Sequence, residues 1–328
     1  MSLTAFVTGA SGFVGCNLVN ELHRQGWDVH VLARLTASLD DIEGVPFTRH
    51  TGDISDAKSL ENVIPSGADA VFHVAASTNF WSRNNAVQKA ANVDGTANVM
   101  DAAIQAGAGR FIHTSSFATW GFPDGVFNEE TPRTDRSDWI NYVRTKYLAE
   151  QLVLDAVAEQ QLDAVILNPA NILGPGDRHN WSRMFRMVQQ GKLPAVPPGG
   201  GNFCDVREVS RAHIQAFHDG RNGEKYLLGG PYAPYAEVIR IAAGILGQKV
   251  PRLTVPAWIF QALSYAMVPF SGIGGKEPDI TPESAMMASR EANCDSSKAK
   301  RELAYRAVPL RTMIEDTIDW MKDQGLLK

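Results

Sequence analysis

The sequence predicts an α/β protein with a doubly wound parallel sheet and a smaller, mostly helical C-terminal lobe. An N-terminal apolar run breaks into a glycine-rich turn and then a helical pattern, LTAFVTGASGFVG. Strand and helix patterns alternate from there to residue 168, which is typical of a parallel sheet. Beyond it the alternation gives way to segments punctuated by proline and glycine. We therefore assign residues 1–168 to the sheet domain, to which 203–230 are expected to return, and 169–328 to the lobe.

The elements of the sheet domain follow from short apolar runs and amphipathic stretches taken in order. The expected strands are Leu3–Val7, Val29–Ala33, a run ending before Thr51, Ala70–Val74, Phe111–Thr114 and Leu162–Leu167. The expected helices are Phe13–Gln25, Asn84–Ala106 and Tyr142–Gln160. Helices and short strands of the lobe are expected over Trp181–Gln190, Val206–His218, Tyr226–Gly229, Tyr235–Leu246, Ala257–Val268, Pro282–Ala292 and Leu310–Asp323.

Composition narrows the class of protein. The 328 residues are 44% apolar and 20% charged, which is ordinary for a soluble globular protein. A net charge of −5 gives no support for nucleic-acid binding, which usually needs a basic face. The three cysteines are widely separated, and no spacing predicts a metal site. With no signal-peptide pattern before the first strand, we expect a cytoplasmic protein.

One stretch, Leu253–Gly275, carries no charged residue and could touch a membrane. Two prolines, several polar residues and three glycines interrupt it, and its helical part is too short to span a bilayer. We expect a core or lid helix, with an interfacial membrane contact as the alternative.

The N-terminal turn predicts a dinucleotide site. Gly9, Gly12 and Gly15 lie between a strand and a helix, where backbone N–H groups and the helix N-terminus can face a diphosphate. The second strand then ends at Arg34, with no acidic residue before Asp40. An arginine at this position accommodates the 2′-phosphate of NADP, whereas NAD sites normally place an acidic residue there. NADP is therefore the expected cofactor, with NAD as the alternative.

Two other polar positions are assigned more ordinary roles. His73 is expected to be a hydrogen-bonded structural histidine within its strand. Asn92 and Gly95 are unfavourable inside a helix, so we expect tertiary contacts to use them.

A second pattern carries the chemistry. Tyr142 and Lys146 are four residues apart and share a helix face. An ammonium group near a phenol stabilises the phenolate and should lower its pKa, which makes Tyr142 a candidate acid–base. Ser116, at the end of the preceding strand, can orient a substrate carbonyl, although Ser115 remains an alternative.

These motifs together resemble an extended short-chain dehydrogenase/reductase, a family with a Rossmann-type sheet. The chain carries them in the family's order: TGASGFVG at residues 8–15, Gly52-Asp53, HVAA at 73–76, Asn92 with Gly95-Thr96, Thr114-Ser115-Ser116, Tyr142 with Lys146, and Asn168-Pro169 with Gly174-Pro175. The resemblance implies that Tyr142 is the acid–base, Lys146 tunes it and holds a ribose, and Ser116 positions the reacting oxygen. It also implies a homodimer paired through the two long helices. The implied cofactor contacts are Gly9, Ser11, Gly12, Phe13, Val14, Arg34, Asp53, Ile54, Ala75, Ala76, Thr78, Asn92, Thr114, Tyr142, Lys146, Pro169, Asn171 and Ile172.

Within the family, the chain is more similar to the dihydroflavonol 4-reductase and 3β-hydroxysteroid dehydrogenase branch than to the sugar-nucleotide enzymes. The latter typically carry Arg-Pro where this chain has Asn168-Pro169, and Arg-Asp where it has Gly201-Asn202. The expected substrate pocket is largely aromatic and apolar, which suits a hydrophobic carbonyl compound. Its predicted members are Asn79, Phe80, Trp81, Ser116, Trp181, Met184 and Phe185.

The hypothesis is an NADP-dependent oxidoreductase that moves a hydride between the nicotinamide and a ketone or secondary alcohol on a largely apolar small molecule. One alternative is an NAD-dependent nucleotide-sugar epimerase or dehydratase. Another is a non-catalytic dinucleotide sensor, which would not need Ser116, Tyr142 and Lys146. We expect no metal, nucleic-acid or membrane partner.

Overall fold

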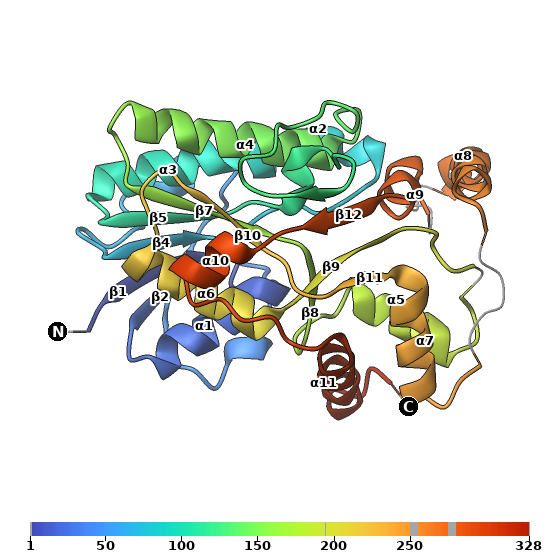
Figure 1. Ribbon diagram of the computed structural model, residues 1–328. Helices are drawn as coiled ribbons and strands as arrows, with labels where there is room; N and C mark the ends of the chain where they lie inside the picture. Colours follow the sequence, from blue (N-terminus) through green and yellow to red (C-terminus); the bar gives the residue numbers. More distant parts are fainter. Residues whose placement is uncertain (1, 194, 250–254, 275–279, 328) are drawn as a thin grey trace.

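The computed structural model describes residues 2–193, 195–249, 255–274 and 280–327. Its main sheet has seven parallel strands in the order β10-β7-β5-β4-β1-β2-β3 (Figure 1). The predicted doubly wound sheet is therefore confirmed. The strands are β1 (Thr4–Thr8), β2 (Asp28–Ala33), β3 (Thr48–Thr51), β4 (Ala70–His73), β5 (Arg110–Thr114), β7 (Ala164–Pro169) and β10 (Lys225–Leu228).

Two layers of helices cover this sheet. Helices α1 (Phe13–Arg24) and α6 (Val206–Asp219) lie on one face, and α3 (Gly95–Ala106) and α4 (Asn141–Ala158) lie on the other (Figure 1). Each layer closes its own apolar core, because a parallel sheet buries both faces. The shorter segments here are 3₁₀ turns at Asp40–Ile42, Ala57–Leu60, Ser82–Asn84 and Phe117–Trp120.

The long helix predicted over Asn84–Ala106 is interrupted. It consists of α2 (Asn85–Lys89), a π-helical turn over Ala90–Asp94, and α3. Asn92 Nδ2 donates to Ser77 O at 3.0 Å and to Thr145 Oγ1 at 3.1 Å, while Ser77 N donates to Asn92 Oδ1 at 2.7 Å. A Cβ on Gly95 would lie 3.0 Å from the Ile54 side chain. Both residues are thus used by tertiary contacts, as predicted, and the π turn lies where they act.

The lobe contains a second sheet that the sequence did not predict. Its strand order is β11-β9-β12-β6, with β8 paired to β9. The strands are β6 (Val126–Phe127), β8 (Asn171–Leu173), β9 (Gly200–Asp205), β11 (Tyr232–Pro234) and β12 (Glu291–Cys294). The element expected over Pro282–Ala292 is divided into helix α9 (Pro282–Met287) and β12, because β12 pairs with β9.

The helices of the lobe surround this sheet. They are α5 (Trp181–Gln189), α7 (Tyr235–Ile245), α8 (Ala257–Gly274), α10 (Ser297–Glu302) and α11 (Leu310–Asp323). Helix α8 packs on α9 (Figure 1). Phe260 of α8 is buried, while Trp258 and Tyr265 are exposed. Within the described ranges, no helix combines the length and apolar character needed to cross a bilayer. The ends of the uncharged stretch, 253–254 and 275, lie outside the described residues.

Candidate active site

The glycine-rich turn follows β1, next to the end of β4. From this point the later strands extend in two directions: β2 and β3 to one side of β1, and β4, β5, β7 and β10 to the other. In parallel sheets this point holds the ligand. Gly9 has φ +78°, and a Cβ there would lie 2.6 Å from Ala75 N. A Cβ on Gly15 would lie 2.1 Å from Gly9 O. Side chains at these positions would therefore fill the turn or push it apart.

The turn opens directly into α1, whose N-terminal residue Gly12 contributes no side-chain cap. Ser11 and Gly12 are exposed, and Phe13 and Val14 are half-buried at the start of the helix. Ala75 N donates to Thr8 Oγ1 at 3.2 Å, which fixes the neighbouring loop that continues through Ala76 to the exposed Thr78. This glycine cradle at a helix N-terminus fits the diphosphate of a dinucleotide.

The residues predicted for the adenosine half lie at the ends of β2 and β3. Arg34 is exposed, and Arg49 Nη2 donates to its carbonyl oxygen at 2.9 Å. Asp53 Oδ1 accepts from Ser55 N at 2.9 Å and from Ser55 Oγ at 2.7 Å. Burial acts to raise the pKa of Asp53, but these hydrogen bonds and the charge of Arg34 outweigh it and lower the pKa. Ile54 O accepts from Asn98 Nδ2 at 2.8 Å, which anchors this edge to α3.

Tyr142 and Lys146 lie in the first part of α4, and Ser116 follows β5. The phenol of Tyr142 is hydrogen-bonded to Ser116, and its ring meets Phe80 edge-on with the ring centroids 5.3 Å apart. Burial raises the pKa of Tyr142, and the Ser116 hydrogen bond only partly opposes this shift. The predicted lowering is therefore wrong for the protein without ligand, because desolvation of the phenol outweighs the other effects.

Lys146 is buried on α4, four residues after Tyr142. Its Nζ donates to Thr114 O at 2.8 Å. Burial lowers the pKa of Lys146 to about 8, and the negative charge of Glu150 acts in the opposite direction. The ammonium group is thus poised to change its charge slightly above neutral pH.

The two candidate serines have different partners. Ser115 Oγ donates to the buried Glu150 Oε2 at 2.8 Å, whereas Ser116 contacts Tyr142. Glu150 also accepts from Asn168 Nδ2 at 2.8 Å and from Lys225 Nζ at 3.0 Å. The sequence did not predict that Glu150 and Lys225 belong to this hydrogen-bond network. The only available signal was that Glu150 lies four residues after Lys146, on the same helix face.

His73 has the structural role that was predicted. It is fully buried, and its Nδ1 and Nε2 lie 2.9 Å from Thr8 Oγ1 and 3.0 Å from Thr96 Oγ1. Burial, reinforced by the charge of Lys146, lowers the pKa of His73 to about 3. A neutral His73 therefore links β1 to α3 beneath the site.

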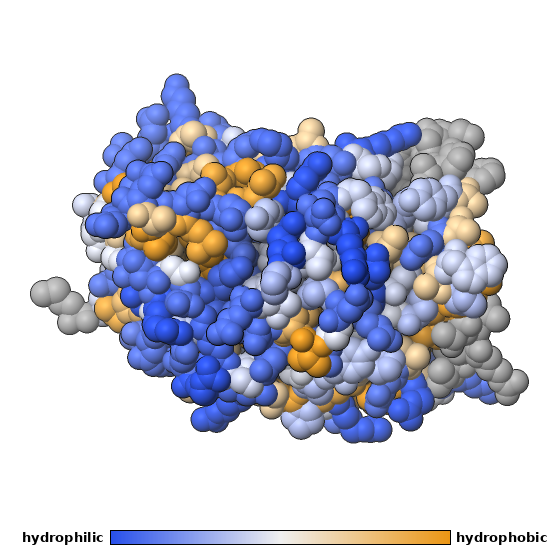
Figure 2. Space-filling view, turned by 45° about the horizontal axis from the view of Figure 1, so that its top comes forward, coloured by the Kyte–Doolittle hydropathy of each residue, from blue (hydrophilic) through white to orange (hydrophobic). Residues whose placement is uncertain are grey.

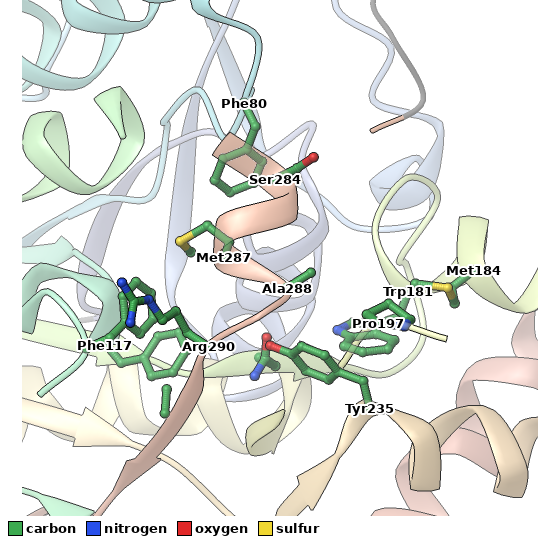
Figure 3. A pocket seen from close by; sticks show the side chains of 13 residues that line it. Phe80, Phe117, Trp181, Met184, Pro197, Tyr235, Ser284, Met287, Ala288 and Arg290 are labelled. Carbon is green, nitrogen blue, oxygen red and sulfur yellow. The ribbon is translucent and has the colours of Figure 1, made fainter. Parts of the chain in front are cut away.

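A cavity of about 210 Å³ adjoins these residues (Figure 3). Phe80, which packs on Tyr142, and Phe117, which follows Ser116 in the chain, both line it. The predicted Trp181 and Met184 line it as well. Asn171, predicted as a cofactor contact, also lines it. The lining residues that the sequence did not predict come from four separate segments: Phe117 and Phe122; Pro197; Tyr235; and Ser284, Met287, Ala288, Arg290 and Ala292.

The remaining residues predicted for the pocket, Asn79, Trp81, Ser116 and Phe185, are not among those that line this cavity. Phe185 is fully buried in the core of the lobe with Leu173 and Phe203, because α5 turns that face inward. Trp81 stacks with the guanidinium of Arg83. Asn79 shapes its own loop by accepting from Trp81 N at 2.8 Å.

The crossing segment joins the two halves of the site. Pro169 ends β7, and Asn171 and Ile172 form β8. Asn171 Nδ2 donates to Asn202 O at 3.0 Å and thereby ties this segment to β9.

A comparison with known families now identifies the class of protein. The model of the NAD dependent epimerase/dehydratase family matches residues 5–229, and the chain belongs to that family. It is an NAD(P)-dependent oxidoreductase of the extended short-chain dehydrogenase/reductase type.

Individual relatives point to one branch. The chain is 31% identical to the "Putative dihydroflavonol 4-reductase" of Synechocystis sp., over 98% of this chain and 96% of that one. It is 33% identical to a 3-beta-hydroxysteroid dehydrogenase of Mycolicibacterium neoaurum, over 91% of this chain and 86% of that one. The crystal structure of gox2253 superposes with a TM-score of 0.85 at 31% identity and covers all of both chains. The predicted resemblance to the dihydroflavonol reductase and hydroxysteroid dehydrogenase branch is confirmed.

Proposed function

We propose that the protein transfers a hydride between NADP(H) and a ketone or secondary alcohol on a small, largely apolar molecule. The observation that carries the proposal is the hydrogen-bonded Tyr142–Ser116 pair, which adjoins a cavity lined mostly by aromatic and apolar side chains. The names of the reductase and steroid-dehydrogenase relatives support a hydrophobic carbonyl substrate.

The chain offers a position for each part of the cofactor, which supplies or accepts the hydride. Backbone N–H groups from Gly9 to Val14 would hold the diphosphate, and Lys146 would hold the nicotinamide ribose. Arg34 would meet the 2′-phosphate, since it is exposed at the end of β2 and no acidic residue takes its place.

Ser116 and Tyr142 would act on the substrate oxygen. In reduction, Ser116 donates a hydrogen bond to the carbonyl and Tyr142 gives its proton to the oxygen that becomes the hydroxyl. In oxidation the same proton returns to Tyr142. The raised pKa keeps the phenol protonated at neutral pH, which favours the reductive direction.

The alternative substrate, a nucleotide sugar, has less support. Asn168, which stands where the sugar-nucleotide enzymes typically carry arginine, donates to the buried Glu150, and Asn202 Nδ2 donates to Gly230 O at 2.8 Å. Both amides are engaged within the protein and supply no positive charge for a diphosphate.

The test is the substitution Tyr142→Phe with Tyr147→Phe as its matched control. Tyr147, on the same helix, stacks on the Arg133 guanidinium. Reduction of aryl and cyclic ketones by NADPH should fall about 10²–10⁴-fold in Tyr142→Phe. NADPH affinity should change much less than turnover, because Tyr142 is only one of many implied cofactor contacts, and Tyr147→Phe should keep its activity. Undiminished turnover by Tyr142→Phe would refute the acid–base role, and turnover of UDP-glucose instead of ketones would favour the sugar-nucleotide alternative.

A further inference from the structure

The cavity beside Tyr142 holds a cation that forms no ion pair with any described residue. Its lining is mainly aromatic and aliphatic, yet it includes Arg290. The Nε atom of Arg290 is buried without a hydrogen-bond partner among the described residues. Over the part of the chain that the structure describes, no carboxylate forms an ion pair with this guanidinium, and the one whose charge interacts with it, Asp124, is paired with Arg136 instead.

The other polar side chains of the cavity are engaged. Asn171 donates to Asn202 O and is hydrogen-bonded to Tyr235. Ser284 Oγ donates to Thr281 O at 3.0 Å. Arg290 therefore has donors to offer to a ligand, whereas its polar neighbours already have partners.

The backbone holds Arg290 firmly in place. Arg290 N donates to Met287 O at 3.2 Å, and Gly200 N donates to Arg290 O at 3.1 Å. A Cβ on Gly199 would lie 2.3 Å from Arg290 O, so β9 approaches closely enough to require glycine. The side chain of Arg290 therefore starts from a fixed point of the backbone at the wall of the cavity.

Other arginines of this protein have carboxylate partners. Arg178 Nη2 donates to Asp41 Oδ1 at 2.6 Å, and Arg207 bonds both Asp205 and Asp316. A half-buried guanidinium among aromatic rings loses hydration without gaining such a partner, which is unfavourable. A carboxylate on the ligand would supply the partner, since guanidinium and carboxylate groups match in a two-pronged geometry.

We infer that Arg290 binds a carboxylate of the substrate, and that the substrate class is an apolar ketone or alcohol that carries a carboxylate. The inference rests on the proposed function for the reacting group. Figure 3 shows Arg290 at the same end of the cavity as Phe117, with Trp181, Pro197 and Met184 at the opposite end. The carboxylate lies at the Phe117 end, near Ser116, and the apolar skeleton extends toward Trp181.

The experiment compares 4-acetylbenzoate with its methyl ester, which has the same ketone and ring but no charge. Binding of each probe to the protein saturated with NADP⁺, which has no hydride to give to the ketone, is measured by calorimetry for the wild type, Arg290→Met and Arg290→Lys. Arg311→Met, which removes an exposed charge on α11, is the matched control. Arg290→Met should weaken the acid by about 10-fold or more and leave the ester unchanged. Arg290→Lys should restore part of the loss, and Arg311→Met should change neither probe.

Two results would overturn the inference: a wild type that binds the acid no better than the ester, or an Arg290→Met protein that keeps the preference for the acid. Because the guanidinium has no ion-pair partner among the described residues, Arg290→Met should keep the wild-type Tm. If Arg290→Met is less stable, the preference for the acid is compared between the wild type and Arg290→Lys instead. Ketone reduction is scored separately. If the acid binds through Arg290 but neither probe is reduced, the proposed function is contradicted and this inference stands. If only the ester is reduced, this inference is contradicted and the proposed function stands.

Discussion

Glu150 shows how much of the site depends on a residue that cannot reach the cleft. It is fully buried, accepts hydrogen bonds from Ser115, Asn168 and Lys225, and is the one charge that opposes the lowered pKa of Lys146. We therefore regard it as a positioning residue, because it acts on the reaction through Lys146.

The substitution Glu150→Gln keeps the shape and removes the charge. The pKa of Lys146 should fall further below about 8, since the opposing carboxylate is lost. The alkaline limb of the kcat/KM profile should move to lower pH, and NADPH affinity above pH 7 should drop. Glu159→Gln, near the exposed end of α4, is the control. If kcat/KM instead falls by the same factor at every pH and the alkaline limb does not shift, the role of Glu150 is purely structural.

Arg34 decides the proposed preference between the two nicotinamide cofactors. Arg34→Gln should weaken NADPH binding by about 10-fold or more and leave NADH binding unchanged, because only NADPH carries the 2′-phosphate. Fluorescence titration of both cofactors measures this, with Arg24→Gln on the exposed face of α1 as control. Tighter binding of NADH than NADPH by the wild type would contradict the assignment.

At the scale of single residues, the sequence predicted the structural role of His73 and the use of Asn92 and Gly95 in tertiary contacts. The roles of Tyr142, Lys146 and the glycines in cofactor binding and catalysis stay predictions. The sequence did not predict the raised pKa of Tyr142 or the exposure of Arg290 to the cavity, since both depend on burial by segments far away in the chain.

At the scale of elements, the turn from β1 to α1 is tightly constrained. In Gly15→Ala the new Cβ would lie 2.1 Å from Gly9 O, so the turn must move. NADPH affinity should fall more than 10-fold and Tm should drop by several degrees. Gly44→Ala is the matched control, because nothing lies within 4 Å of a Cβ there. An unchanged Kd in Gly15→Ala would show that the turn is free to adjust.

Two apolar side chains are exposed on the long helices through which pairing is predicted. Val87 on α2 and Leu148 on α4 are 68% and 40% exposed. Figure 2 shows separate apolar areas, in orange, on the face that includes the top of Figure 1. We propose that two copies pair through this surface.

The substitution Leu148→Glu places a charge in that surface. Sedimentation velocity should give a dimer for the wild type and a monomer for Leu148→Glu, since an unpaired carboxylate in an interface is unfavourable. Val126→Glu, at a residue on β6 that is 65% exposed, should remain dimeric. A wild type that sediments as a monomer would refute the proposed pairing.

The elements of the sheet domain were predictable within one or two residues in most cases, because strands and helices there alternate with clear periodicity. The helix predicted over Leu310–Asp323 was likewise correct. The small second sheet was not predictable. Its strands are two to six residues long and pair across distant segments, such as β9 with β12, so no local pattern records them.

At the scale of the whole molecule, three buried histidines make stability depend on pH. Burial lowers the pKa of His73 to about 3, that of His213 to about 4, and that of His113 well below its usual value. Because each folded-state pKa lies below the unfolded value near 6.5, their contribution is complete above pH 6.5 and is lost as the pH falls. The loss should be about 1.4 kcal/mol per pH unit for each histidine.

Urea unfolding from pH 7.5 to 4.5 measures this slope. Both ring nitrogens of His113 are buried without hydrogen-bond partners among the described residues. His113→Phe should therefore remove one of the three histidine contributions to the pH dependence of the free energy of unfolding. At pH 7.5 it should not lower the stability. His23→Gln on the exposed side of α1 should leave the slope unchanged. Equal slopes in His113→Phe and the wild type would show that His113 is not protonated on unfolding.

The strand order also has a consequence for biosynthesis. β7 pairs on one side with β5 and on the other with β10, whose residues come more than fifty positions later. While a ribosome is still making the intervening segment, the apolar run Ala164–Leu167 has an open backbone edge that another nascent chain could capture. Translation that stalls before Leu228 emerges should therefore yield aggregates, whereas a chain released after that point can seal its own sheet.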